Sequence, residues 1–262
     1  MSAYFERIDE AAFRPTPAVA GVWNTQEQHI APALGLITHV IERAHAARRD
    51  DGLQLARISF DILGTMPIDT VEITVRVVRP GRTIELVEAT LAHAGRPAVI
   101  TRAWMLQPAD TAAIAGSGFT TMPGPAELEP FDAGALWPGG FVHTVEIRRD
   151  EQEPGRARVW LRPRLPLLEG EPISSTARML GLADIANGMT TRVMPDVAVF
   201  PNVDLTAHLT RPPATEWIGF DTSVTFGPHG VGLTHTILHD EIGPIGSVAQ
   251  ALTIRPTGRG EP

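Results

Sequence analysis

The feature that most constrains this chain is a weak internal repeat, in which the second half follows the first at an offset of 146 positions. The clearest match is Leu34–Leu36, which reads Leu-Gly-Leu and recurs as Leu180–Leu182. Such a repeat predicts two similar units in tandem. Further identities at the same offset are Leu63, Pro67, Val78, Gly81, Thr90, His93, Ala103 and Leu106, which fall on Leu209, Pro213, Val224, Gly227, Thr236, His239, Ala249 and Leu252.

The two copies differ in where they carry polar residues. At several positions the second copy has a carboxylate, a hydroxyl or an amide where the first has another residue. This asymmetry predicts a duplicated scaffold with one functional site, in the second copy. At the offset of 146, Thr38 corresponds to Asp184, Ile58 to Asp204, Val75 to Asp221, Val77 to Ser223, Arg79 to Thr225 and Trp104 to Gln250.

Length and composition fit two globular units. A chain of 262 residues can hold two domains of roughly 120 residues each. Its hydrophobic content of 43% lets each half bury a core. The segment 107–140 is rich in Pro, Gly, Ala and Thr and lacks periodicity. We therefore expect an N-terminal domain at 1–107, a linker at 108–140 and a C-terminal domain carrying the site at 141–262.

Charge and residue usage exclude several classes of function. A net charge of −8 argues against nucleic acid or an anionic membrane as a partner. All 22 basic residues are Arg, which excludes lysine Schiff-base chemistry and a P-loop lysine. The chain has no Cys, so it has no thiolate nucleophile and no cysteine metal site. Residues 1–10 show no apolar signal core, and we expect a cytoplasmic protein.

Hydrophobic periodicity predicts one helix followed by antiparallel strands in each copy. A helical pattern covers Thr25 to Ala47, with Asn24 or Thr25 as its N-cap. In the second copy, Ser174 or Ser175 caps a counterpart helix that carries Leu180 and Ile185. Alternating patterns predict strands at 71–77, 84–92 and 98–106, and then at 141–148, 156–162, 203–209, 217–226, 231–239 and 247–254.

This order of elements predicts an α+β fold of the tandem double-hotdog type. In this arrangement each half is a long helix wrapped by a curved antiparallel sheet. The two sheets join edge to edge, which leaves no exposed edge at the junction.

The second copy also resembles the C-terminal half of bacterial acyl-CoA thioesterase II. The resemblance is carried by Val203-Asp204, Arg211-Pro212, Glu216-Trp217, a hydroxyl-rich strand ending at Thr225, and Gln250 five residues before Arg255. The N-terminal half is similar to the same superfamily through Gln28, Leu34 and the segment 81–104. One departure is Leu205, where the family often has His after the Asp.

The resemblance implies a double hotdog that hydrolyses acyl-CoA thioesters to free acid and CoA. It assigns the catalytic set to Asp204, Thr225 and Gln250, which together would hold the attacking water. Such chemistry needs a base and oxyanion donors but no cofactor and no metal. Backbone amides near Ser175 to Arg178, at the start of the second helix, are candidate donors to the thioester oxygen.

Other residues compete for these roles. Leu182-Ala183-Asp184 resembles the helix of single-hotdog phenylacetyl-CoA thioesterases, in which the Asp is catalytic, so Asp184 is an alternative base. Thr222 or Ser223 could replace Thr225, and Asp221 would support the site from a core-facing position. Each residue also has a structural interpretation, since Asp204 could accept backbone N–H groups and Gln250 could satisfy a buried backbone group.

Two other functions stay open. Hotdog proteins include enoyl-thioester hydratases, which use an Asp–His pair, and Asp204 with His208 is the candidate pair here. A non-catalytic protein that binds acyl thioesters is the other alternative.

The spacing of His235 and His239 does not suggest metal binding, because in a strand they would lie about 13 Å apart. The expected partners are acyl-CoA and, from the resemblance, further copies of the chain in a homo-oligomer.

Overall fold

The computed structural model describes residues 3–258. Its first half consists of β1 (Phe5–Arg7), β2 (Ala12–Pro15), η1 (Pro17–Val19), α1 (Ile30–Ala46), β3 (Gln54–Ile62), β4 (Val71–Arg79), β5 (Ile84–His93) and β6 (Arg96–Leu106). The following segment and second half consist of η2 (Ala112–Ile114), η3 (Pro125–Glu127), β7 (Glu129–Pro130), η4 (Ala133–Ala135), η5 (Val142–Thr144), β8 (Val145–Glu153), β9 (Arg156–Pro163), α2 (Ser175–Leu180), η6 (Ala183–Ile185), α3 (Ala186–Met189), β10 (Ala198–Val199), β11 (Asp204–Leu209), β12 (Ile218–Phe226), β13 (Val231–Asp240), β14 (Gly243–Thr253) and β15 (Arg255–Pro256).

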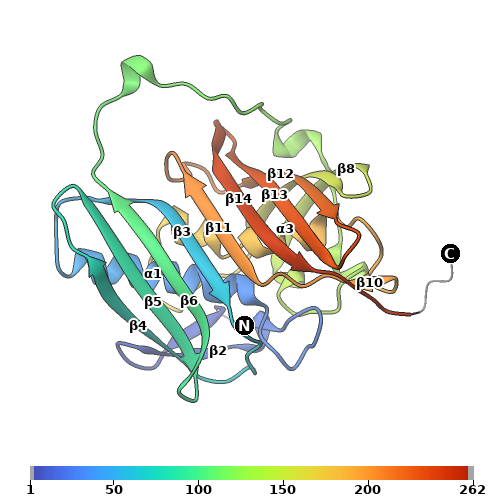
Figure 1. The fold of residues 1–262 in the computed structure, drawn as a ribbon, viewed down its shortest axis with the longest axis horizontal. Coiled ribbons are helices and arrows are strands. Elements are labelled where there is room, and N and C mark those ends of the chain that lie inside the picture. Colours follow the sequence, from blue (N-terminus) through green and yellow to red (C-terminus); the bar gives the residue numbers. More distant parts are fainter. Residues whose placement is uncertain (1–2, 259–262) are drawn as a thin grey trace.

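One large antiparallel sheet joins the two halves. Its 13 strands follow the order β1-β2-β4-β5-β6-β3-β11-β14-β13-β12-β9-β8-β7. The halves meet where β3 pairs with β11, and these two strands lie side by side in the middle of the sheet (Figure 1). The predicted tandem hotdog, with its sheets joined edge to edge, is confirmed. Counted outward from this junction, the strands follow nearly the same order in the two halves. The halves are therefore related by a pseudo-twofold axis at the junction.

The strand registers correct the offset of the repeat. Leu91 pairs with Val99 in the first half, and Leu238 pairs with Gly246 in the second, so each residue lies 147 positions after its counterpart. The same offset relates the β4–β5 ladder to the β12–β13 ladder and the β3–β6 ladder to the β11–β14 ladder. The offset of 146 is therefore wrong for the strands. Because side chains alternate between faces, an error of one residue assigns every strand residue to the opposite face.

Strand β3 is absent from the elements expected from the sequence, although it forms the junction. Its residues Ile58 and Phe60 are buried and alternate with Ser59 and Asp61 on the other face. This alternation is the usual signal of a half-buried strand. Because it lies between the predicted helix and the stronger alternating pattern at 71–77, it was not predicted as a strand.

Helix α1 begins later than predicted. Residues 25–28 form a loop instead of the first helical turn, and Gln28 donates its backbone N–H to Met66 O. His29 is the N-cap, because its Nδ1 accepts a hydrogen bond from the backbone N–H of Ala31 at 3.1 Å. The predicted caps Asn24 and Thr25 are therefore wrong. This loop places the imidazole of His29 at the start of the helix.

The second half lacks the predicted long helix. Where α1 runs for 17 residues, its counterpart is divided into α2, the 3₁₀ turn η6 and α3, of 6, 3 and 4 residues. The sequence is consistent with a shorter helical segment, since Gly188 and Thr190 are poor helix formers. The counterpart stretch of α1 contains Glu42 and Ala44, which favour a helix. The break places Asp184 in the 3₁₀ turn.

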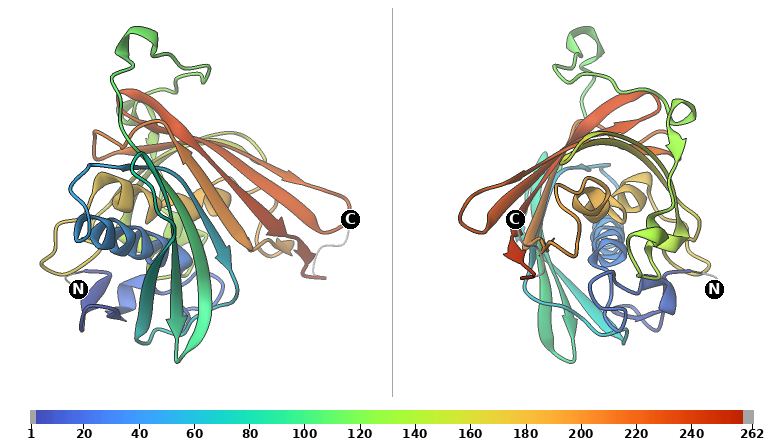
Figure 2. Two further views of the ribbon diagram at one scale, coloured as in Figure 1. Left: turned by 60° about the vertical axis from the view of Figure 1, so that its left-hand side comes forward. Right: turned by 90° about the vertical axis from the view of Figure 1, so that its right-hand side faces the viewer.

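The central helices cross at equivalent glycines. A methyl group on Gly35 would lie 2.8 Å from the backbone oxygen of Ala177 and 2.9 Å from Cα of Gly181. Only glycine permits such an approach of two backbones. The recurrence of Leu-Gly-Leu in the sequence therefore reflects this contact. Figure 2 shows α1 in blue and the α2–α3 segment in gold on the same side of the curved sheet.

The segment 107–140 contacts the second half at several points. Trp160 on β9 donates its Nε1–H to Pro123 O at 2.8 Å, and β7 pairs with β8 at the sheet edge. Further along, Trp137 is buried and donates its Nε1–H to Gly188 O at 3.0 Å. The second part of this segment thus packs against α3. Within residues 3–258, no helix is long and apolar enough to cross a membrane.

Candidate active site

Asp184 is the centre of a buried polar cluster in the second half. Its Oδ1 accepts a hydrogen bond from Nδ2 of Asn202 at 2.6 Å and a longer one from Nε2 of Gln250 at 3.3 Å. Asp184 comes from η6, Asn202 from the loop before β11, and Gln250 from the inner face of β14. Three segments that are remote in sequence therefore converge on one carboxylate.

The surroundings of Asp184 raise its affinity for protons. Burial raises the pKa of its carboxyl group from 3.8 to about 6, and the hydrogen bond from Asn202 lowers it only in part. A carboxyl group with a pKa near 6 can both lose and regain a proton near neutral pH. Such perturbed carboxyl groups in a cavity are typical of catalytic acids and bases.

The first half contributes His29 to the same cluster. Its Nδ1 lies 3.7 Å from Oδ2 of Asp184, which is too long for a hydrogen bond. Because Nδ1 accepts the N–H of Ala31, the ring proton of the neutral imidazole is on Nε2. Burial lowers the pKa of His29 to about 4, so the ring is neutral at physiological pH. The site therefore lies between the two halves, at the N-terminus of α1.

Two buried oxygen atoms, one on β13 and one on β14, have no hydrogen-bond partner within residues 3–258. Gln250 is fully buried, and its Oε1 makes no hydrogen bond within residues 3–258. Thr234 lies directly opposite Gln250 on β13, and its hydroxyl also has no partner among the described residues. A buried polar atom without a partner is costly, and a water molecule commonly satisfies it. Gln250 thus has an unsatisfied acceptor on the same amide group that donates to Asp184, and Thr234 lies opposite it on the next strand.

The structure does not gather Asp204, Thr225 and Gln250 around one point. Asp204 accepts the backbone N–H of Ala251 at 2.6 Å, which is the structural role considered for it from the sequence. Thr225 is exposed on the outer face of β12, whereas Gln250 is on the inner face of β14. The offset of 146 matched Asp204 with the buried Ile58, and the corrected offset matches it with Arg57.

The supporting residues expected on β12 also face outward. Asp221 forms an ion pair with Arg156 at 2.7 Å, and Ser223 lies on the same outer face. Thr222 does face the core, where its hydroxyl lies 2.8 Å from that of Thr236. Asp221 therefore lies on the outer face of β12 and not on the core-facing side expected for it, although it is buried there, at 5% exposed. The alternation along β12 explains this, since the residues facing the core are 218, 220, 222 and 224.

The N-terminus of α2 is occupied by a side chain. Ser174 accepts the backbone N–H of Ala177 at 2.9 Å and donates its own hydroxyl to Oε2 of Glu42 at 2.6 Å. Burial raises the pKa of Glu42. The amides near Ser175 to Arg178, expected to bind the thioester oxygen, thus face Glu42 of α1. The helix N-terminus beside Asp184 is that of α1.

Two hollows share Asn202 in their walls, and the smaller of them is also lined by Asp184. The first is a small cavity of about 30 Å³, lined by His29, Asp184 and Asn202 together with Trp23, Trp137, Val142 and Met189, among others. The second is an open groove of about 260 Å³ that runs between the start of α1 and the ends of β3 and β14. Its walls include Ile30, Met66, Val203 and Arg255. Asn202 therefore stands between the small cavity and the larger groove, and both hollows are partly open to solvent.

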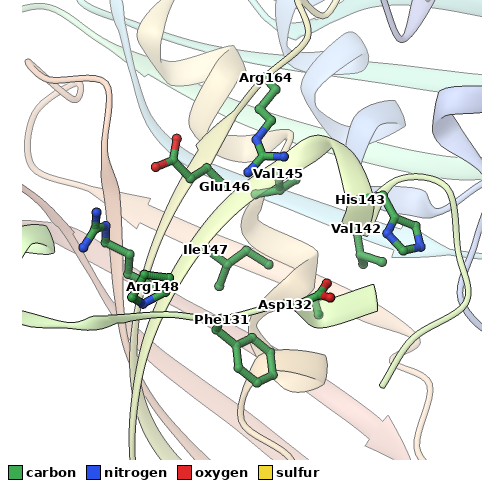
Figure 3. A pocket seen from close by; sticks show the side chains of 11 residues that line it. Phe131, Asp132, Val142, His143, Val145, Glu146, Ile147, Arg148 and Arg164 are labelled. Atoms are coloured by element: carbon green, nitrogen blue, oxygen red, sulfur yellow. The ribbon is translucent and has the colours of Figure 1, made fainter. Parts of the chain in front are cut away.

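A larger cavity of about 470 Å³ lies at the edge of β8 (Figure 3). Its carboxylates are already engaged, since Asp132 accepts the N–H of Gly134 and Glu146 pairs with Arg162. Arg148 donates to Leu128 O. The cavity shares Val142 with the small cavity but does not include Asp184.

No metal centre accompanies the cluster within the described part of the chain. Among residues 3–258, no group of three or more His, Asp and Glu side chains gathers as metal ligands would. His208, the partner expected for Asp204, is exposed on β11. Within the buried cluster, the Asp–His contact joins Asp184 to His29.

Sequence reasoning missed His29, Asn202 and Thr234. His29 lay inside the predicted helix, and Asn202 stands next to the Val203-Asp204 pair that carried the resemblance. The available signal was Asp184 itself, a carboxylate among apolar neighbours that needs a buried partner. Its partners are 155, 18 and 66 positions away, and no local pattern joins them.

Comparisons with known families match both halves. Residues 19–106 match the model of the acyl-CoA thioesterase N-terminal domain, and residues 123–254 match that of the acyl-CoA thioesterase C-terminal domain. The second match alone spans half of the chain. A comparison with curated protein sequences gave no match.

Several solved structures share the fold. An acyl-CoA thioesterase II, TesB2, from Mycobacterium marinum superimposes with a TM-score of 0.68 at 14% identity, covering 98% of this chain and 97% of that one. The tesB protein of Mycobacterium avium subs paratuberculosis gives 0.70 at 16% identity, with 96% of both chains covered. The dehydratase domain of RzxB from Pseudomonas fluorescens gives 0.52 at 9% identity, with 94% of both covered. At these identities the likeness shows the fold alone.

Proposed function

Because the chain belongs to the acyl-CoA thioesterase family, we propose that it hydrolyses acyl-CoA thioesters with Asp184 as the general base. The observation that carries this proposal is the buried carboxylate of Asp184, which holds hydrogen bonds from Asn202 and Gln250 and faces the N-terminus of α1. This replaces Asp204 as the proposed base and keeps Gln250.

The hydrolysis needs one water and one proton acceptor. A water beside Asp184 attacks the thioester carbonyl carbon while the carboxylate takes its proton, giving a tetrahedral intermediate with negative charge on the former carbonyl oxygen. The C–S bond then breaks, and Asp184 returns the proton to the departing sulfur. The products are the free acid and the CoA thiol. Every atom of the added water appears in the products, and no oxidant or reductant is needed.

In this proposal Gln250 and Asn202 stabilise the carboxylate of Asp184, and Gln250 also orients the attacking water. Their amide N–H groups stabilise the ionised form of Asp184, so it can act as a base near neutral pH. The free Oε1 of Gln250 and the hydroxyl of Thr234 would accept and donate hydrogen bonds to the attacking water. We propose Thr234, in place of Thr225, as the hydroxyl that orients this water.

Stabilisation of the oxyanion would come from the first half. The N-terminal end of α1 carries a positive partial charge that favours an anion nearby. The Nε2–H of His29, which has no hydrogen-bond partner within the described residues, is an additional donor at that end. A preorganised donor of this kind contributes about 10²- to 10³-fold to the rate of acyl transfer.

The decisive experiment compares Asp184→Asn with Asp204→Asn. Release of free thiol from a panel of acyl-CoA esters is measured for both variants and for the parent. We expect Asp184→Asn to lose at least about 10³-fold in kcat, because the base is removed. Asp204→Asn should keep most of the activity, because Asp204 holds a backbone amide instead of the water.

The opposite result, with activity lost only in Asp204→Asn, would contradict this assignment. If the parent releases no thiol from any ester but is stabilised against heat by acyl-CoA, the protein binds acyl thioesters without hydrolysing them.

A second candidate function is hydration of enoyl thioesters, and the contact between His29 and Asp184 favours it. An Asp–His pair from two hotdog units can add water across the double bond, with the oxygen bonding to the β-carbon and a proton to the α-carbon. In this case Asp184 would deliver the proton, and His29 would activate the water after its Nδ1 releases the N–H of Ala31. The low pKa of His29 makes it a weak base, which favours hydrolysis as the main proposal.

The two functions separate in one assay. Crotonyl-CoA is incubated with the protein, and loss of the enoyl absorbance is compared with release of thiol. Thiol release with the double bond intact supports the thioesterase. Loss of the double bond without thiol release, abolished in His29→Gln, would establish the hydratase instead.

A further inference from the structure

The small cavity beside Asp184 has aromatic walls. The indole of Trp23 stands edge-on to Trp137 with ring centroids 5.1 Å apart, and to Phe200 at 5.5 Å. Trp23 and Trp137 line the cavity, with Val142 and Met189 completing its apolar side. Asp184 and Asn202 form its polar side. An acyl group bound here would therefore have its carbonyl carbon next to Asp184 and the end of its chain against the rings of Trp23 and Trp137.

The volume of this cavity limits what can enter it. It measures about 30 Å³, which is room for about two water-sized groups. An acetyl or propionyl group fits this space next to the carbonyl carbon. A longer chain would need one of the walls to move, because close-packed walls do not yield to additional methylene groups without strain.

The walls differ in how firmly they are held. Trp137 is 2% exposed and its indole donates a hydrogen bond to Gly188 O, so it is anchored to α3. Phe200 behind it is 1% exposed. Trp23 is 44% exposed and belongs to the loop before α1. Of these three aromatic residues, Trp23 is the one that can be removed without opening the core.

The open groove on the other side of Asn202 suits the CoA arm. At about 260 Å³ it is much larger than the cavity, and Ile30, Met66 and Val203 give it an apolar floor. Arg255 lies at its rim, is exposed, and makes no ion pair within residues 3–258. A free guanidinium at the mouth of a groove matches the phosphates of CoA, which must remain near solvent.

We infer that the protein prefers short acyl groups of two or three carbons, and that Trp23 sets this limit as the exposed wall of the cavity beside Asp184. The inference rests on the proposed hydrolysis and adds the substrate class to it. Trp23 is here a specificity-determining residue and takes no part in the chemistry.

The test measures kcat/KM for acetyl-, butyryl- and octanoyl-CoA in the parent, in Trp23→Ala and in Trp217→Ala. Trp217 is a matched control, since it is half-buried and its ring packs against the guanidinium of Arg162, away from the cavity. We expect the parent to favour acetyl-CoA over octanoyl-CoA by at least about 100-fold, since each methylene that does not fit costs about tenfold or more. Trp23→Ala should raise kcat/KM for octanoyl-CoA about tenfold or more, with little change for acetyl-CoA.

Trp217→Ala should keep the parent's ratio between the two esters. Arg255→Gln should raise KM by a similar factor for all three esters, because it acts on their common CoA part. A chain-length-dependent effect of Arg255→Gln would overturn the placement of the CoA arm in the groove. A parent that hydrolyses octanoyl-CoA as fast as acetyl-CoA would overturn the inference while leaving the proposed hydrolysis intact.

Binding of stable thioethers separates the inference from the proposed function. If no ester is hydrolysed, the dissociation constants of S-ethyl-CoA and S-octyl-CoA are measured by calorimetry. Tighter binding of the ethyl compound by the parent, with the octyl compound gaining in Trp23→Ala, supports the size limit even though hydrolysis has failed. Equal binding of both compounds by the parent overturns the size limit.

Discussion

The two halves have the same strand order and registers but differ in their central helix. In the first half α1 is continuous over Ile30–Ala46, and Thr38 donates its hydroxyl to Leu34 O within the helix. In the second half the helix breaks into α2, η6 and α3, and Asp184, the counterpart of Thr38, bonds to groups outside the helix. A continuous helix satisfies its own polar groups, whereas a broken one can present a buried carboxylate to a ligand.

The partners of Asp184 show the same difference. By the strand registers, Leu55 is the first-half counterpart of Asn202 and Ala103 that of Gln250. The first half thus has Leu55 and Ala103 at the positions where the second half has the two amide side chains that donate to Asp184. The comparison teaches that a buried polar cluster can be built on a duplicated scaffold by breaking one helix and changing three residues, with the strand order unchanged.

The most direct test of this comparison replaces Asn202 and Gln250 of the second half by their counterparts in the first half. Asn202→Leu and Gln250→Ala should each lower kcat for thioester hydrolysis by about 10²-fold, because each removes a donor to the base and Gln250 also loses contact with the water. Steady-state kinetics on a short acyl-CoA measures the effect, with circular dichroism to confirm folding. The matched control is Thr101→Val, a buried hydroxyl without a described partner on the first-half strand β6, and it should leave kcat unchanged. Equal losses in the control would mean that the effect is on the core.

The helix crossing gives the next largest effect, on stability. Gly35→Ala should lower the free energy of unfolding by about 2 kcal/mol, because the added methyl group meets backbone atoms of α2 that cannot move aside. Gly181→Ala should cost less, since its nearest contact would be 3.3 Å away. Urea denaturation of the two variants checks the order, and the reverse order would show that the helices do not cross at these glycines as described.

The pH dependence tests Asp184 itself. Hydrolysis needs its ionised form, so kcat/KM should rise about tenfold per pH unit up to about pH 6 and then level off. Stability changes in the opposite direction. Because the native state holds the proton more tightly, stability falls as the pH rises from about 4 to about 6, and Asp184→Asn should recover up to about 3 kcal/mol at pH 7. A flat rate profile across pH 6 would contradict the assignment of the base.

His29 should contribute to stability with the opposite sign. Its native pKa of about 4 lies below the ordinary 6.5, so the unfolded state binds the proton more tightly in that range. Stability therefore rises as the pH increases from about 4 to 6.5, and His29→Gln should remove this rise. Thermal unfolding of both variants between pH 4 and pH 7 compares the two contributions. Shifts of the same sign would exclude this pair of pKa values.

The smallest effect is expected at Thr225. Because it is exposed on the outer face of β12, Thr225→Val should change kcat by less than about twofold, whereas Thr234→Val on the inner face should lower it by about tenfold. Both are conservative strand substitutions, and kinetics on the same ester distinguishes them. A loss in Thr225→Val alone would restore the original assignment.

Much of the fold could be predicted from the sequence, because it is encoded in local periodicity. The alternation of Val71, Ile73 and Val75 indicates a strand wherever it occurs, and the recurrence of Leu-Gly-Leu revealed the duplication. The site was less accessible. Asp204 and Gln250 were predicted from the family resemblance, and Asp184 from the resemblance of its helix to single-hotdog thioesterases. The repeat offset, wrong by one residue for the strands, aligned Asp204 with the buried Ile58 instead of Arg57.

The sequence by itself determined that the chain is a tandem repeat, since pattern and composition are properties of neighbouring residues, and it predicted the polar chemistry in the second copy. Only the tertiary structure decided which face each strand residue occupies, because face depends on register, and register is set by pairing between distant strands. Only the fold could bring His29, Asp184, Asn202 and Gln250 together, since burial and hydrogen bonding of a carboxylate depend on which segments pack around it.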